Sequence, residues 1–230
     1  MAHDAPGAVS GGGHTPELVI FDCDGVLVDS ERISNEVLAS MLSDEGLSKT
    51  LEEARRDYQG LLLGDIATAA EAELGRPLPV GWLEAYEHAR AEAFRRELRA
   101  VPGAEEAVTR VSAAGVDVCV ASQGKLEKTR LSLQLTGLRE LFSDRALFSA
   151  HSVARGKPHP DLFLHAAITM GVDPSVCVVV EDTPSGVVAA VAAGMRVFGY
   201  AADSDEDALR QAGAEILDAM EELPGRFGLY

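Results

Sequence analysis

Two aspartates stand two residues apart where an apolar run ends. Asp22 and Asp24 lie within Phe21-Asp22-Cys23-Asp24-Gly25, directly after Leu18-Val19-Ile20. In an extended chain, side chains at positions i and i+2 project to the same side. Two carboxylates so close together are unfavourable unless a cation lies between them or one is protonated, and Gly25 allows a sharp turn out of a strand. The pattern fits a cation-assisted acidic site, and it also fits an ordinary Asp/Gly turn.

A hydroxyl and a lysine occupy two further constrained positions. Ser122 and Gln123 follow the apolar run 116–121, which only Asp117 interrupts. A small hydroxyl there, followed by backbone N–H groups entering a helix, suits a phosphate oxygen. Lys157 lies in Gly156-Lys157-Pro158-His159-Pro160, where it is stiffly placed to neutralise an anion as a point charge. Alone, these segments also fit a serine helix cap and a plain loop.

Two more acids end the very apolar segment Val178-Val179-Val180. Glu181 and Asp182 follow it, and Thr183-Pro184-Ser185-Gly186 then leads into a helical pattern. Acids at the end of a buried strand seldom lack a partner, and a hard cation with oxygen ligands is the obvious one. The alternative is an aspartate helix cap beside an exposed glutamate.

The elements around these motifs alternate between short apolar runs and amphipathic segments. The runs predict strands at 18–21, 116–121, 176–180 and 196–200, with weaker candidates at 146–149 and 215–217. The segments predict helices at 104–114, 126–135, 161–170, 185–193 and 205–212. This alternation predicts an α/β fold whose parallel sheet is covered on both faces, a Rossmann-like three-layer core. Such sheets place their sites at the carboxyl ends of the strands.

One region lacks any convincing strand. Helical patterns fill it at 30–45, 51–58, 63–74 and 81–98, and about 70 residues are too many for a loop. We therefore expect an inserted four-helix cap at 31–100 and a core built from 17–30 and 101–230. The segment 1–16 is rich in Gly, Ala and Pro and predicts a flexible tail without the apolar run of a signal peptide.

Composition narrows the class of partner. The chain has 230 residues, of which 47% are hydrophobic, and a formal net charge of −17. So acidic a surface repels nucleic acid and anionic lipid, and no segment reaches the ~18 apolar residues of a membrane span. Cys23, Cys119 and Cys177 all fall in apolar runs. They predict reduced, buried thiols and a cytoplasmic location rather than a disulfide framework or a zinc site.

In this order, each at a strand end, the four motifs resemble those of the haloacid dehalogenase superfamily. The helical insert resembles the α-helical cap of its first subclass, and the resemblance runs from Leu18 to about Leu223. The Gly-Lys-Pro motif followed by Pro160-Asp161-Leu162-Phe163 is a strong local match. Within that superfamily the chain resembles phosphoglycolate phosphatase, β-phosphoglucomutase and small sugar-phosphate phosphatases.

The resemblance implies a role for each motif. Asp22 would attack phosphorus and form an aspartyl-phosphate, and Asp24 would protonate the leaving alcohol and then activate water. Mg²⁺ would be held by Asp22, the Asp24 carbonyl, Asp182 and Glu181. Ser122 and the Gln123 backbone would bind the phosphoryl group. Lys157 would be both catalytic and substrate-binding, because it would balance the negative charge on Asp22 and the phosphate.

Several positions bear on the reaction. Dehalogenases of the superfamily lack the second aspartate, so Asp24 favours phosphoryl transfer. Its phosphonate hydrolases need a cap lysine for a Schiff base, and the predicted cap holds only Lys49, in a loop-like stretch. Ser34 stands where β-phosphoglucomutase carries a histidine, which weakens a mutase reading without excluding it. Gln123 departs from the usual asparagine, which leaves the backbone role and puts a side-chain contact in doubt.

The cap is expected to set specificity. Gly60, in Tyr58-Gln59-Gly60, falls where relatives have a cap loop that contacts the substrate. Arg95 and Arg96 would either bind a second anionic group or, as we favour, lie on a solvated helix face.

The sequence thus predicts a Mg²⁺-dependent phosphatase for a small phosphorylated metabolite, a sugar or sugar-acid phosphate, acting as a monomer or weak homodimer. The alternatives are a sugar phosphomutase and a non-catalytic phosphate-ligand-binding protein.

Overall fold

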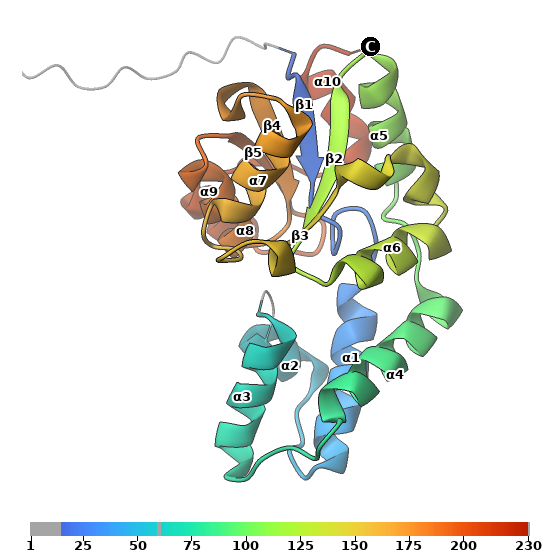
Figure 1. Ribbon diagram of the computed structural model, residues 1–230, viewed down its shortest axis with the longest axis vertical. Coiled ribbons are helices and arrows are strands. Elements are labelled where there is room, and N and C mark those ends of the chain that lie inside the picture. Colours follow the sequence, from blue (N-terminus) through green and yellow to red (C-terminus); the bar gives the residue numbers. More distant parts are fainter. Residues whose placement is uncertain (1–14, 59–60, 230) are drawn as a thin grey trace, which may run out of the picture.

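A parallel sheet of six strands forms the centre of the protein. The computed structural model describes residues 15–58 and 61–229 (Figure 1). The strand order is β3-β2-β1-β4-β5-β6, and every neighbouring pair is parallel. The strands are β1 (Leu18–Phe21), β2 (Asp117–Ser122), β3 (Leu147–Ser149), β4 (Cys177–Glu181), β5 (Arg196–Tyr200) and β6 (Glu215–Leu217). The α/β prediction is confirmed, with all six strands within one residue of the expected bounds.

Both faces of the sheet are covered, which explains why the central strands are apolar throughout. In β1, Val19 and Phe21 belong to the hydrophobic core on one face, and Leu18 and Ile20 belong to the core on the other. The first face is packed by α5 (Ala104–Ala113) and α6 (Leu126–Leu135), with α10 (Leu223–Arg226) beside α5. The second is packed by α7 (Asp161–Met170), α8 (Pro184–Ala192) and α9 (Glu206–Ala212). A strand buried on both sides has no polar face to alternate with.

The segment after β1 forms four helices with a core of their own. They are α1 (Glu31–Asp44), α2 (Leu51–Tyr58), α3 (Leu63–Leu74) and α4 (Trp82–Glu97), so the four predicted helices are confirmed. Their buried side chains form one cluster, Leu38, Leu42, Ala54, Tyr58, Ile66, Ala70, Trp82 and Tyr86. Figure 1 shows this helical block beyond the carboxyl end of β1. That it acts as a separate cap domain stays a prediction.

The predicted tail and the predicted absence of a membrane span can be compared with the structure only where the structure describes the chain. Most of the predicted tail, residues 1–14, lies outside them. Within them, none of the helices combines the length and the apolar character that crossing a lipid bilayer requires.

The three cysteines provide a test of the core. Their exposed fractions are 0, 0 and 1%, and all three are unpaired. Burial raises the pKa of Cys23 and Cys119 well above the usual value and that of Cys177 to about 11, so reactive thiolate is scarce. We expect no reaction of the native protein with Ellman's reagent at pH 8 within minutes, and three equivalents of released thiolate in guanidinium chloride. A fast equivalent before denaturation would contradict this packing.

Candidate active site

Three neighbouring strands deliver acidic and hydroxyl groups to one edge of the sheet. Phe21 is paired with Val120 of β2 and Val180 of β4, and the Asp22 N–H still donates to the Val180 carbonyl at 2.9 Å. Asp22 is therefore level with Ala121 and Glu181, and Ser122 lies one residue further along β2. The structure thus brings these expected site residues together at the carboxyl ends of the strands.

A buried ammonium group joins two of these strand ends. The Lys157 Nζ donates to Asp22 Oδ1, to Glu181 Oε1 at 2.6 Å and to the Ala121 carbonyl at 3.2 Å. These three bonds use all three ammonium donors, and the Lys157 side chain is only 4% exposed. Burial acts against the charge, but Asp22 and Glu181 outweigh it and raise the pKa of Lys157. The lysine is therefore a fixed positive charge against Asp22.

Asp24 is held by a second cation. Its Oδ1 accepts from Lys128 of α6 and from Ser30, and its Oδ2 lies 3.4 Å from the Ser122 hydroxyl. Burial opposes the carboxylate form, yet Lys128 and Ser30 together keep the pKa of Asp24 below its usual value. Asp22 Oδ2 in turn accepts from the Asp24 N–H at 2.8 Å. Asp22 and Asp24 are thus paired with different lysines, Lys157 and Lys128.

Glu181 is engaged on both oxygens. Its Oε1 accepts from Lys157, and its Oε2 accepts from the Thr183 N–H at 2.9 Å and the Thr183 hydroxyl at 2.8 Å. A Cβ at Gly186 would overlap with this carboxylate. These contacts favour a role for Glu181 in orienting Lys157, and its assignment as a metal ligand stays a prediction.

Asp182 is the acid without a protein partner. Its Oδ1 is buried and accepts no hydrogen bond from the described residues. Burial, followed by the charges of Glu181 and Asp22, raises the pKa of Asp182 well above its usual value, and burial raises that of Asp22 to about 7. Excess buried negative charge and an unsatisfied carboxylate oxygen fit a hard divalent cation.

The donor set for such a cation is short. Within residues 15–58 and 61–229 no three His, Cys, Asp or Glu side chains form a ready-made metal cluster. The expected set of Asp22, Asp182 and the Asp24 carbonyl supplies two carboxylates and one backbone oxygen, which suits Mg²⁺ because that ion usually keeps several waters.

The Gln123 side chain faces the lysine loop. Its Oε1 accepts from the Lys157 N–H at 3.1 Å, and a Cβ at Gly156 would overlap with the Gln123 amide. The longer side chain thus bridges from β2 to the loop that carries Lys157. This contact was not foreseen from the sequence, which left only the backbone of Gln123 with a role.

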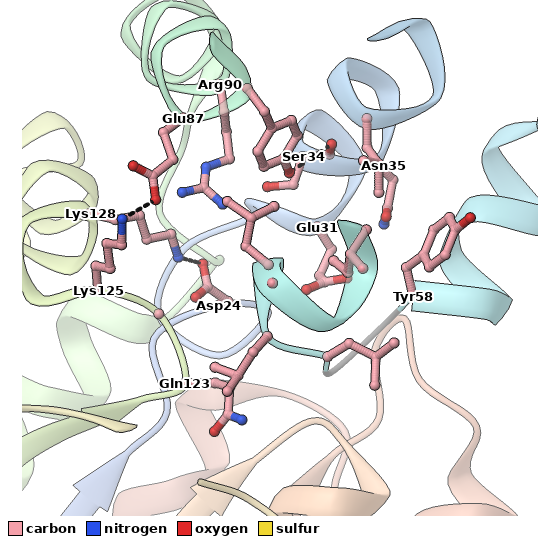
Figure 2. Close-up of a pocket in the computed structure, with 18 of the residues that line it drawn as sticks. Asp24, Glu31, Ser34, Asn35, Tyr58, Glu87, Arg90, Gln123, Lys125 and Lys128 are labelled. Carbon is pink, nitrogen blue, oxygen red and sulfur yellow. Dashed lines mark hydrogen bonds and ion pairs between the residues drawn. The ribbon is translucent and has the colours of Figure 1, made fainter. Parts of the chain in front are cut away.

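A cavity of about 300 Å³ lies between the strand ends and the helical block. Its lining includes Asp22, Asp24 and Lys157 from the sheet edge, and further polar side chains that sequence reasoning passed over, namely Glu31, Asn35, Glu87, Arg90, Lys125, Lys128 and His151. Figure 2 shows most of these converging from α1, α4 and α6. An ion pair of 2.6 Å between Lys125 and Glu87 connects core and helical block across it.

Other expected cap residues lie elsewhere. Arg95 and Arg96 are exposed and do not line the cavity, and Arg95 is paired with Glu92, in accord with the solvated face that we favoured. Lys49 is held by Asp57 at 2.7 Å and Glu73 at 2.8 Å, away from the cavity. Gly60 falls outside the described residues.

Fold and site together define a Rossmann-like α/β enzyme with an acidic, lysine-bearing centre under a helical insert. The sequence profile of haloacid dehalogenase-like hydrolases matches residues 16–194, and the chain belongs to this family. Hydrolases of the family generally use Mg²⁺ and an aspartyl intermediate.

Individual relatives are similar over nearly the whole chain. The 6-phosphogluconate phosphatase of Escherichia coli K12 is 32% identical over 90% of this chain and 93% of its own length. A crystal structure of a family hydrolase from Deinococcus radiodurans, with bound phosphate and sodium, is 32% identical with a TM-score of 0.77, covering 94% and 97% of the two chains. A putative β-phosphoglucomutase from Thermotoga maritima is 27% identical with a TM-score of 0.74, covering 91% and 97%.

The turn after Asp24 yields a testable comparison of two glycines. Gly25 has φ +78° and Gly115 has φ +83°, a region that costs other residues about 1–2 kcal/mol. A Cβ at Gly115 meets nothing within 4 Å, whereas one at Gly25 would overlap with the Asp182 carboxylate. In urea denaturation we expect Gly115→Ala to show the backbone cost alone and Gly25→Ala a larger loss. Equal losses would mean that Asp182 does not pack against Gly25.

Proposed function

We propose that this chain is a Mg²⁺-dependent phosphatase that hydrolyses a small phosphomonoester, a sugar or sugar-acid phosphate, through an aspartyl-phosphate on Asp22. The observation that carries the proposal is the buried Lys157, which neutralises Asp22 while Asp24, two residues on, is held apart by Lys128. A carboxylate attacks phosphorus only when the charge that accumulates is balanced, and this geometry supplies a fixed positive charge at that atom.

Each residue then has a defined task. Asp22 Oδ attacks phosphorus, the bond from phosphorus to the ester oxygen breaks, and that oxygen takes a proton from Asp24. Asp24 must bind that proton from water before the step, because Lys128 and Ser30 favour its ionised form. In the second half, Asp24 takes a proton from water, whose oxygen attacks phosphorus and releases Asp22. Ser122, whose hydroxyl already accepts from the Gly124 N–H at 3.1 Å, would bind a phosphoryl oxygen together with the Gln123 N–H. Lys157 balances the charge throughout.

Magnesium would be held by Asp22, Asp182 and the Asp24 carbonyl. When bound, it would polarise the phosphoryl group and neutralise its charge. The Asp182 oxygen that accepts no hydrogen bond supports this assignment. Both oxygens of Glu181 are already hydrogen-bonded, which favours a role for that residue in orienting Lys157.

The helical segment 31–100 would act as the cap that encloses the substrate. In support, α1 and α4 contribute side chains to the cavity, and the Lys125–Glu87 pair crosses from core to cap. A volume of about 300 Å³ is at the lower end for ligand pockets and suits a small metabolite.

Buried, unpaired thiols support a cytoplasmic location. A monomer or weak homodimer stays a prediction.

A phosphomutase is the second candidate, suggested by the similarity to a putative β-phosphoglucomutase. Ser34, at the position of the mutase histidine, lines the cavity. It offers a hydroxyl, which does not titrate near neutral pH. The hydrolase is therefore preferred, and release of phosphate without a bisphosphate activator would separate the two. A non-catalytic binder on this fold has no need of both Asp22 and Asp24 on separate lysines.

The nucleophile can be tested directly. With Mg²⁺ and p-nitrophenyl phosphate, we expect Asp22→Asn to lower kcat by roughly 10³-fold or more, because the amide cannot form the phosphoenzyme. Asp207→Asn, on the exposed surface of α9, serves as the matched control and should retain wild-type turnover. Circular dichroism should show both variants folded. A folded Asp22→Asn protein with wild-type turnover would refute the assignment.

The cation site predicts an inverse effect on stability. Asp182→Asn removes a buried carboxyl group whose ionisation is opposed by burial and by the charges of Glu181 and Asp22. Without Mg²⁺ we expect its melting temperature to rise by about 2–4 °C, as about 1 kcal/mol gives in a chain of this size. Mg²⁺ should raise the melting temperature of the wild type and raise that of Asp182→Asn much less. An identical Mg²⁺ response in both would show that Asp182 is not a ligand.

A further inference from the structure

One cation in the cavity has no acid of its own. Arg90 extends from α4 into the cavity (Figure 2), and within the described part of the chain no carboxylate pairs with its guanidinium at 4.0 Å or less. Its Cζ lies 5.1 Å from the Tyr86 ring centre and 5.9 Å from the Phe94 ring centre. Tyr86, Arg90 and Phe94 are four residues apart along one helix face, so the two rings hold the guanidinium in place.

Arg90 lies close to the second lysine of the site. The Lys128 Nζ is 5.9 Å from the same Phe94 ring centre, so one cation approaches from the cap and the other from the core. The charge of Arg90 also acts on Asp24, because it adds to the larger effect of Lys128 in lowering the pKa of Asp24 against burial. Arg90 and Asp24, the acid that would protonate the leaving alcohol, both line the cavity (Figure 2).

At the α4–α6 end of the cavity, Lys128 is paired with Asp24 and Lys125 is paired with Glu87. Arg90 forms no ion pair with a described residue, and the Glu31 carboxyl of α1 lies near Asp24 and Lys128 instead. A single unmatched guanidinium suits a singly charged, planar oxyanion, which it binds through two parallel N–H bonds. A second phosphate would bring nearly two charges close to Asp24.

The side chains that α1 contributes to the cavity have a different character. They are Glu31, Ser34 and Asn35, and Figure 2 shows them on a helix separate from the one that carries Arg90. Uncharged and acidic oxygen and nitrogen groups of this kind bind hydroxyl groups rather than anions. The cavity therefore has an anion-binding end at α4 and α6 and a hydroxyl-binding side at α1.

We propose that Arg90 is the specificity-determining residue of this enzyme and binds a carboxylate on the leaving alcohol, so that a phosphorylated sugar acid is preferred over the corresponding sugar alcohol. This inference rests on the proposed phosphatase function. It places the carboxylate near Asp24, between α4 of the cap and α6 of the core, where both elements must be present for binding. It also explains how an acidic protein recognises an anionic substrate through local charge.

The test uses two substrates that differ in one group. In 6-phosphogluconate a carboxylate stands where glucitol 6-phosphate has a CH₂OH group, and the rest of the chain is the same. We expect the wild type to favour the acid in kcat/KM by about 10- to 100-fold, mainly through KM. Arg90→Met retains the apolar stem that packs on the two rings and should lose this preference, while Arg90→Lys should retain part of it. Arg95→Met, on the exposed face of the same helix, should keep the wild-type ratio.

The outcomes separate the two proposals. A wild type inert toward p-nitrophenyl phosphate and toward both sugar esters would refute the phosphatase itself. An active wild type with equal kcat/KM for acid and alcohol would refute only the carboxylate site. Retention of the wild-type preference in Arg90→Met would show that the apolar stem, and not the guanidinium charge, sets it, and would also refute the carboxylate site. A hexitol 1,6-bisphosphate preferred over the acid would show that the site binds a second phosphate, which contradicts the carboxylate assignment.

Discussion

The structure depends on one buried ammonium group. Four carboxylates, those of Asp22, Asp24, Glu181 and Asp182, are concentrated at the edge of a sheet whose strands are otherwise apolar. Without compensation such a cluster is among the most unfavourable arrangements that a protein core can contain. Lys157 offsets part of this cost by bonding to Asp22, to Glu181 and to the end of β2 at once. The part that it leaves uncompensated is at Asp182, where the proposed cation would bind.

The details around the site follow from fixing that ammonium in place. Gln123 reaches across from β2 to hold the backbone N–H of the lysine, and Thr183 occupies the far oxygen of Glu181. Glycines stand where the acids need room, because a side chain at position 25 or 186 would overlap with a carboxylate. The space around these carboxylates is therefore limited at Gly25 and Gly186, which restricts how far Asp182 and Glu181 can move when charge changes during the reaction.

The strands and the acidic residues at their ends could be predicted from the sequence, for physical reasons. The strands at 18–21 and 177–181 are apolar on both faces, so their runs are continuous and their ends are marked by acids. Lys128 and Arg90 escaped notice because each is one charged residue among several on an amphipathic helix, and only the packing of α4 against α6 decides which of them face the cavity. For the same reason the sequence could not show which arginines of α4 face the cavity, and it drew attention to Arg95 and Arg96. These two lie near Arg90 in sequence but on another face of the helix. The short α10 carries too few residues for helical periodicity to show.

The positions of the site residues along the chain have a consequence for how the protein folds during synthesis. The ion pair between Asp22 and Lys157 joins positions 135 apart, and the hydrogen bond between Ser122 and Asp24 joins positions 98 apart. Contacts so distant in sequence form late, because the intervening chain must first be ordered. While the chain is being synthesised, the first aspartates and the whole helical segment are complete long before Lys157 and Asp182 exist. A chain that ends before Lys157 therefore lacks the partner of Asp22, and the four carboxylates and the ammonium group come together only once β4 has been made.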